Sequence, residues 1–325
     1  MFPTPIKLAP ANPEEVMTIG RSRYVQTGVS DGPKPMIAAA SVEQLWYGID
    51  HPEGVAIDVD GLIWCGGEDG QIYCGRLDDK SPTQVATLPG RTGGLAIDEG
   101  GNAYCADLTE PAVYRITREG QVQAVSTGTA ERPTRVPNFP AFLPSGELVY
   151  TDSGVWGDND GCIYLVSGNG ETSIADTTAS SFPNGLAVSP DGATLAVVES
   201  ALPGVSILSI GPDGSLTNRR VAVEMPGTIP DGVAYDTEGR LLVSCWAPDS
   251  IFLVPPLGDP RLLACDPRRF AFNQPTNIAF VPGSRTVIAA NIGERFLSVF
   301  EHEAEGAPLY RPHFPAPGLL AAESA

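Results

Sequence analysis

The chain has 325 residues, of which 42% are hydrophobic and 18% charged, with 36 Gly and 31 Pro spread along its length. This composition is typical of a globular protein with a sizeable core and many turns, which argues against a disordered or fibrous chain. A formal net charge of −19 argues against nucleic acid or an anionic membrane as a partner, because both would repel an acidic surface.

The N-terminal segment MFPTPIKLAPANPEEV lacks the apolar stretch of a secretion signal. No other stretch of the sequence is apolar for long enough to predict a transmembrane helix. The six cysteines form no Cys-x-x-Cys pair, and most fall in expected strands, so we expect buried free thiols rather than disulfides or a zinc site. Together these features predict a cytoplasmic protein, a monomer or a small homo-oligomer.

One phrase recurs six times along the chain. Its versions are HPEGVAIDVDGLIWCGG (51–67), RTGGLAIDEGGNAYCAD (91–107), VPNFPAFLPSGELVYTD (136–152), FPNGLAVSPDGATLAVVE (182–199), IPDGVAYDTEGRLLVSC (229–245) and QPTNIAFVPGSRTVIAAN (274–291). Each version has an apolar run, a polar turn usually with Gly, and a second apolar run, which is typical of a β-hairpin. Two further strand-like runs follow the first hairpin, so one unit supplies four strands.

The spacing of the phrase predicts a propeller. Successive units start 40, 45, 46, 47 and 45 residues apart, and a period near 45 built from strands is that of propeller blades. We therefore predict an all-β, six-bladed β-propeller over residues 41–301, with extensions at 1–40 and 302–325. The last unit offers three strands, so SVEQLWYG (41–48) is expected to be its outer strand and to close the ring.

The residues just before the first strand of each unit should gather on one face, near the central axis. In ring order they are Glu53, Gly93, Asn138, Asn184, Asp231 and Thr276, and we call them the axial column. Glu53, Asn138, Asn184 and Asp231 carry oxygen ligands, and two converging carboxylates would repel each other without a cation.

The axial column therefore predicts a divalent cation. Carboxylate and amide oxygens favour Ca²⁺, with Zn²⁺, Mn²⁺ or Mg²⁺ as alternatives. The structural alternative is that Asn184 and Asp231, each before Gly, are ordinary turn residues. That alternative accounts poorly for Glu53 and not for Asn138, which precedes Phe. His51 as a base and GDNDG (157–161) as a calcium loop are weaker candidates, since His51 has no partner His and GDNDG lacks EF-hand spacing.

At these residues the chain resembles the SMP-30/gluconolactonase/LRE family over positions 42–300. The matching phrases are PEGVAID at Glu53, RVPNFPAF at Asn138, FPNGLAVSPDG at Asn184 and IPDGVAYD at Asp231, together with LVYTD (148–152). The resemblance implies a six-bladed propeller with an axial divalent metal held by these four residues. It also implies hydrolysis of a lactone, with Asp231 as the base that activates water or as the nucleophile.

Further residues are expected on the same face. Asp107, Asp152 and Glu199 end second strands, where they orient the ligands or bond nearby backbone. Arg135 is a candidate for a substrate carbonyl or carboxylate, or is a plain surface residue. Phe139, Trp156 and Trp246 suggest a substrate less polar than an aldonolactone; packing is the alternative for each.

Three functions remain open at this stage. The first is a metal-dependent lactonase, acting on a small-molecule substrate. The second is a hydrolase of another ester, such as an organophosphate, that uses the same metal. The third is a non-enzymatic binding propeller whose metal is structural, because the propeller fold hosts many functions. A lid formed by residues 1–40 is also left open.

Overall fold

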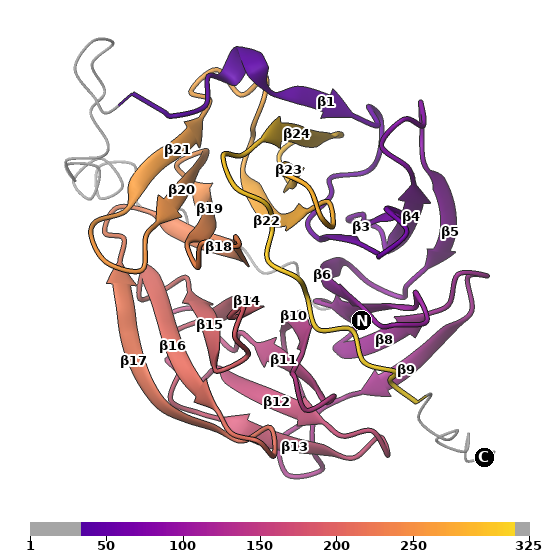
Figure 1. The fold of residues 1–325 in the computed structure, drawn as a ribbon. Coiled ribbons are helices and arrows are strands. Elements are labelled where there is room, and N and C mark those ends of the chain that lie inside the picture. Colours follow the sequence, from indigo (N-terminus) through magenta and orange to yellow (C-terminus); the bar gives the residue numbers. More distant parts are fainter. Residues whose placement is uncertain (1–33, 316–325) are drawn as a thin grey trace.

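The computed structural model describes residues 34–315, which contain one short 3-10 turn, η1 (Ala39–Ser41), and 24 strands. The strands form six sheets of four strands each, arranged around a central axis (Figure 1). Neighbouring strands within these six sheets run antiparallel, as the pairings of β2 with β3 and β3 with β4 illustrate. The predicted fold class, a six-bladed propeller, is confirmed.

Blades 1 to 5 take their strands in chain order from the axis outward (Figure 1). Blade 1 has β2 (Val55–Ile57), β3 (Ile63–Gly66), β4 (Gln71–Gly75) and β5 (Thr83–Thr87), and blade 2 has β6 (Thr92–Ile97), β7 (Ala103–Asp107), β8 (Ala112–Ile116) and β9 (Val122–Ser126). Blade 3 has β10 (Pro137–Phe142), β11 (Leu148–Asp152), β12 (Cys162–Val166) and β13 (Thr172–Asp176), and blade 4 has β14 (Pro183–Val188), β15 (Thr194–Glu199), β16 (Gly204–Ile210) and β17 (Leu216–Glu224). Blade 5 has β18 (Ile229–Tyr235), β19 (Leu241–Ala247), β20 (Ser250–Val254) and β21 (Arg261–Cys265).

Blade 6 joins the two ends of the described chain. Its inner strands are β22 (Pro275–Phe280), β23 (Thr286–Asn291) and β24 (Leu297–Glu301), and its outer strand is β1 (Glu43–Leu45). Glu43 pairs with Val299 and Leu45 with Leu297, so the closing strand predicted at 41–48 is confirmed. Closure gives β24 a partner and removes an open edge from the sheet.

The core lies between the blades. Six apolar clusters are found, one at each interface between neighbouring blades. Between blades 4 and 5, for example, Ala187 and Val198 pack with Val233 and Val243. All six cysteines are free; five are buried and Cys265 is half-buried, as the sequence predicted. Each blade therefore depends on both neighbours for the burial of its apolar faces.

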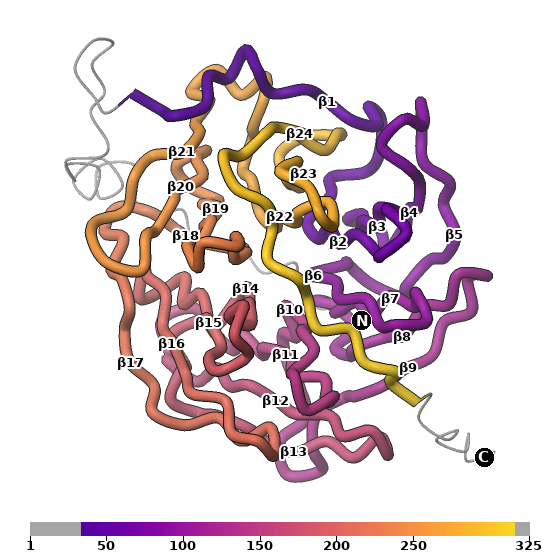
Figure 2. Tube along the Cα trace, viewed as in Figure 1, coloured from indigo at the N-terminus to yellow at the C-terminus, as the bar shows by residue number. Residues whose placement is uncertain are grey.

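The two faces of the ring differ. We call the face where the first strands begin the site face, and the opposite one the far face. After β24, residues 302–315 run across the far face in front of the axis (Figure 2). The Arg311 guanidinium donates to the backbone carbonyls of Ile57 and Ile97, at the ends of β2 and β6. A cavity of about 500 Å³ remains beneath this segment.

The remaining terminal residues, 1–33 and 316–325, lie outside the described part of the chain. Most of the predicted N-terminal extension, with its possible lid, falls there. Within residues 34–315, no helix is long and apolar enough to cross a bilayer.

Close backbone approach holds the first strands together around the axis. A Cβ on Gly54 would lie 2.1 Å from the Gly93 carbonyl oxygen of blade 2, and one on Gly185 would lie 2.7 Å from the Asp231 oxygen of blade 5. Neither glycine has a positive φ, so neither is a turn glycine. The Asn184-Gly185 and Asp231-Gly232 pairs lie inside β14 and β18, so these residues belong to strands and not to turns as the structural alternative supposed. These glycines leave room for the next blade.

Substitution of Gly54 by Ala tests this packing. The added methyl group has no space against the Gly93 carbonyl, so we expect Gly54→Ala to lower the free energy of unfolding by about 1–3 kcal/mol. Denaturant unfolding followed by circular dichroism measures the change.

Gly168→Ala is the matched control, because its Cβ would meet Pro315 at an ordinary 3.6 Å. Its effect should stay within about 0.5 kcal/mol. Equal stability of the two variants would show that the inner strands can separate at little cost.

Candidate functional site

The axial column lies inside the first strands of most blades, at irregular positions. Asn138, Asn184 and Asp231 are the second or third residues of β10, β14 and β18. Each first strand begins earlier than the sequence predicted, and its register with the second strand shifts there, as between Pro137 and Pro140. Such a bulge turns a side chain away from the regular alternation of the strand. Glu53, by contrast, precedes β2 by two residues.

Hydroxyl groups from neighbouring blades hold the backbone of the column. Thr151 Oγ1 donates to the Asn184 carbonyl across 2.9 Å. Thr276 Oγ1 donates to the Glu53 carbonyl across 2.7 Å. Ser200 Oγ donates to the Pro230 carbonyl, next to Asp231, across 2.6 Å. Each bond crosses a blade interface, so the column residues are fixed relative to one another.

Three oxygens of the column are buried without a hydrogen bond. Among the described residues, the Oδ1 atoms of Asn138, Asn184 and Asp231 have no partner, although all three side chains are buried. Buried acceptors are normally paired, and leaving one unpaired costs about 1–3 kcal/mol. Three such oxygens in one set therefore call for a ligand with positive charge.

The two acidic members of the column have raised pKa values. Burial raises the pKa of Asp231 well above its ordinary value, and the nearby Glu53 charge raises it further, while Arg91 and Asn184 lower it less. Burial also raises the pKa of Glu53, against the opposing effect of Arg91, whose Nη2 lies 3.2 Å from Glu53 Oε2. Both carboxyls thus resist ionisation unless another positive charge joins them.

These residues fit a hard divalent cation. The donor set consists of two carboxylates and two amide oxygens, the ligand types that Ca²⁺ prefers. Within residues 34–315, no three His, Cys, Asp or Glu side chains come together to hold a metal. The axial column is not such a group, because only two of its four oxygen donors are acids and the other two are amides.

The carboxylates at the ends of the second strands hold backbone, not the column side chains. Asp152 accepts from the N–H groups of Arg135 and Val136, at 2.9 and 3.0 Å. Asp107 accepts from Gly90 across 2.8 Å. Glu199 accepts from Ser181 across 3.1 Å. In each blade the bonded N–H lies two or three residues before the column, so these carboxylates position the column indirectly.

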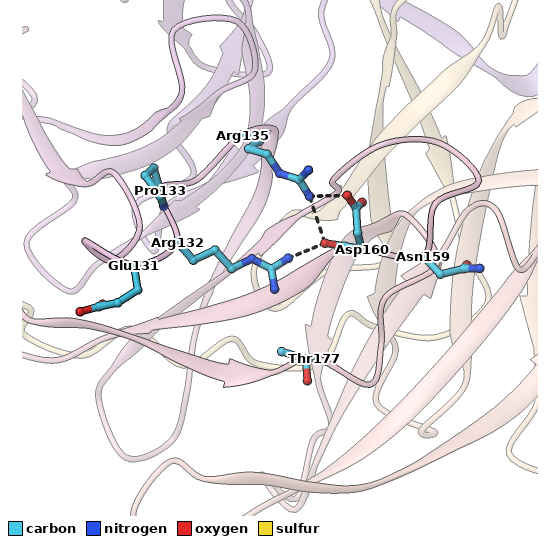
Figure 3. Close-up of a pocket in the computed structure, with 8 residues that line it drawn as sticks. Glu131, Arg132, Pro133, Arg135, Asn159, Asp160 and Thr177 are labelled. Carbon is cyan, nitrogen blue, oxygen red and sulfur yellow. Dashed lines mark hydrogen bonds and ion pairs between the residues drawn. The ribbon is translucent and has the colours of Figure 1, made fainter.

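Two of the predicted substrate residues, Arg135 and Trp156, belong to blade 3, where Arg135 contacts the loop that carries Trp156. The Arg135 guanidinium is 2.8 Å from Asp160 Oδ2 (Figure 3). Asp160 belongs to the loop between β11 and β12 that carries Trp156, whose exposed fraction is 51%. An open pocket of about 510 Å³ lies beside this ion pair, lined by Arg132, Arg135, Asp160 and Thr177 among others and by no residue of the column.

The other predicted residues are more scattered. Phe139 is buried in the cluster between blades 3 and 4 and also lines the cavity of the far face. Trp246 is half-buried near the end of β19. His51 Nδ1 is 3.0 Å from Asp50 Oδ1 and 3.6 Å from Glu68 Oε2, at the rim of blade 1.

Sequence reasoning missed three residues that the structure brings to the column. Arg91 pairs with Glu53, and its position two residues before Gly93 was a usable signal. Asn277 is 1% exposed, and among the described residues neither of its amide atoms has a partner. It stands where four of the other five units have Gly. Phe182, two residues before Asn184, has a positive φ of 57°, which no sequence pattern reveals.

Two curated proteins are similar in sequence to about half of this chain. The chain is 28% identical over 184 residues to diisopropyl-fluorophosphatase of Loligo vulgaris, covering 53% of this chain and 56% of that protein. It is 27% identical over 189 residues to a gluconolactonase of Zymomonas mobilis, covering 51% of this chain and 52% of that protein. The chain thus spans about half the length of the curated relatives it matches.

Solved structures share the fold. A calcium-binding regucalcin from Agrobacterium tumefaciens superposes with a TM-score of 0.67 at 17% identity, over 87% of this chain and all of that one. A model for the SMP-30/Gluconolactonase/LRE-like region matches residues 78–287, which include Asn138, Asn184 and Asp231. The chain therefore belongs to the SMP-30/gluconolactonase/LRE-like family.

Proposed function

We propose that this protein is a divalent-metal-dependent hydrolase that opens lactones at the axial column. The observation that carries the proposal is the set of three buried, unpartnered oxygens on Asn138, Asn184 and Asp231, next to the buried carboxyl of Glu53. Membership of the family adds support, as does the gluconolactonase among the relatives.

Glu53, Asn138, Asn184 and Asp231 would hold the cation. A cation bound there supplies positive charge that polarises the ester carbonyl and stabilises the negative charge that develops on its oxygen. Ca²⁺ is the ion we propose, on the basis of the oxygen donors and of the calcium-binding regucalcin with the same fold. Zn²⁺, Mn²⁺ and Mg²⁺ are the alternative ions.

The reactive group of the chain is the Asp231 carboxylate. It either accepts a proton from the attacking water or attacks the carbonyl carbon itself. Burial and the Glu53 charge raise its pKa in the metal-free chain, and the charge of a bound cation would lower it again, which would keep the carboxylate ionised for either role. Arg91 holds Glu53 across 3.2 Å and places a second positive charge beside the column. The hydroxyl bonds from Thr151 and Ser200 keep the backbone on either side in place.

A second candidate is hydrolysis of an organophosphate ester at the same residues. The match to diisopropyl-fluorophosphatase, the more identical of the two relatives described, favours it. The donor set serves a phosphoryl oxygen as well as a carbonyl oxygen, since both develop negative charge during attack. A binding propeller with a structural metal is the non-enzymatic alternative.

The first prediction concerns metal dependence. We expect chelator-treated protein to release no acid from a panel of aliphatic and aromatic lactones, and refilling with Ca²⁺ to restore the rate. Asp231→Asn should lower kcat by about 10²- to 10⁴-fold, because it removes the base or nucleophile. A pH-stat assay measures acid release, with diisopropyl fluorophosphate in a parallel arm.

Asp78→Asn, in the exposed loop between β4 and β5 on the far face, serves as the control and should keep the wild-type rate. Activity on diisopropyl fluorophosphate without activity on any lactone would contradict the lactonase proposal and support the second candidate. If the protein binds metal but is active in neither arm, the non-enzymatic binding propeller is supported.

The second prediction separates metal binding from activity. In metal-free protein the raised pKa of Asp231 means that ionisation destabilises the fold as pH rises above the ordinary carboxyl range. Asp231→Asn should therefore raise the Tm of chelator-treated protein at pH 7. The same variant should lose most of the rise in Tm that Ca²⁺ gives the wild type.

Differential scanning calorimetry with and without Ca²⁺ measures both effects, and Asp78→Asn should change neither. A lower Tm for metal-free Asp231→Asn would mean that the carboxylate is stabilised by neighbours in the chain, contrary to the site described here.

A further inference from the structure

The loop between β11 and β12 contacts Pro183, the residue before Asn184, at both of its ends. Ser153 Oγ, at its start, donates to the Pro183 carbonyl across 2.8 Å. At its end, a Cβ on Gly161 would lie 2.3 Å from Pro183 Cδ. Pro183 directly precedes Asn184 in β14. The loop of residues 153–161, here called the Trp156 loop, therefore leaves and returns beside the column on the site face.

Two arginines clamp this loop through one residue. Arg132 and Arg135 both donate to the Asp160 carbonyl, and Arg135 also pairs with the Asp160 carboxylate at 2.8 Å. Figure 3 shows both guanidinium groups converging on Asp160. The other carboxylate oxygen accepts from the Val155 N–H across 2.8 Å. The Val155 bond first, and then Arg135, lower the pKa of Asp160, so the clamp stays charged at neutral pH.

The loop presents an aromatic surface next to the column. The Trp156 ring packs edge-on against Phe182, with centroids 5.0 Å apart. Phe182 has a positive φ of 57°, an unfavourable backbone state for a bulky residue. Its carbonyl accepts from the Ser200 N–H across 3.1 Å, and Ser200 Oγ contacts Asn184 Nδ2 at 3.3 Å. A short chain of contacts thus links Trp156 to a proposed metal ligand.

Half of the Trp156 side chain stays in solvent despite this packing, with Val155 beside it also 50% exposed. A large aromatic side chain that packs on Phe182 and is left half-exposed is suited to bind an apolar surface.

We propose that the Trp156 loop is the specificity wall of the site, selecting substrates with a flat aromatic group next to the ester. Trp156 and Phe182 contact that group, and Asp160 is a positioning residue that acts through the loop. The inference rests on the proposed hydrolase function, which it deepens by naming the substrate class. Stacking on an exposed aromatic ring favours aromatic over aliphatic substrates.

The first test measures binding without hydrolysis. The probe is 2-tetralone, a bicyclic aromatic ketone with the shape of 3,4-dihydrocoumarin but no ester to cleave. Titration calorimetry on the Ca²⁺-loaded protein should show binding that Trp156→Ala weakens about tenfold and Trp156→Phe largely retains. Leu257→Ala, which removes a 91% exposed apolar side chain from the loop between β20 and β21, should bind like the wild type.

The second test measures selectivity with 3,4-dihydrocoumarin and δ-valerolactone. Trp156→Ala should lower kcat/KM about tenfold for the aromatic lactone, mainly through KM, and less than about twofold for the aliphatic one. Asp160→Ala should lower the aromatic rate about fivefold with an unchanged aliphatic rate. Asp158→Asn, an exposed residue of the same loop, is the matched control and should change neither.

The outcomes separate the two proposals. If wild-type protein binds 2-tetralone through Trp156 but cleaves no ester, the hydrolase function fails and the aromatic wall stands. If the protein cleaves lactones while Trp156→Ala changes both substrates equally, or changes neither, the wall is wrong and the hydrolase stands. An Asp160→Ala variant that loses both rates together would assign Asp160 to stability and overturn its positioning role.

Discussion

The site depends on how closely the first strands of neighbouring blades approach one another. Glycines such as Gly54 and Gly185 let a carbonyl of the next blade come within the space of a methyl group. Hydroxyls of Thr151 and Thr276 then bond across the same interfaces. Because every link joins two blades, the axial oxygens hold one arrangement only while the whole ring is intact. Preorganisation of this kind is what a metal or oxyanion site requires.

The two buried carboxyl groups at the axis lower the stability of the metal-free fold when they are ionised, and a bound cation would offset that cost. Glu53 and Asp231 are buried in a chain that already carries a net charge of −19, and their pKa values are raised. Arg91 offsets part of this cost and enters from blade 2, where the column residue is Gly93 and offers no oxygen. One of the two blades without a proposed ligand thus supplies the counter-charge, and the remaining imbalance would favour binding of the proposed cation.

The propeller was predictable because one phrase repeats at nearly constant spacing, and β1 because the last unit lacked a strand. The axial column was predictable as a set of residues, although Asn138 and Asn184 lie within strands and not before them. Repetition cannot reveal contacts between different loops. The pairing of Arg135 with Asp160 therefore had no signal in the sequence. The burial of Phe139 in the core, by contrast, was the packing alternative that the sequence had left open.

Ring closure by β1 has a consequence for how the chain folds. Glu43 pairs with Val299. The outer edge of blade 6 therefore cannot form until nearly all of the described chain has been synthesised. Contacts this distant in sequence are slow to form, since a long loop must be ordered first. Until then, β1 has been synthesised but lacks its partner strand β24, and its unpaired backbone groups can bond to another chain. The nascent protein should therefore be most prone to aggregation just before its last blade is completed, a hazard that vanishes once the circle is joined.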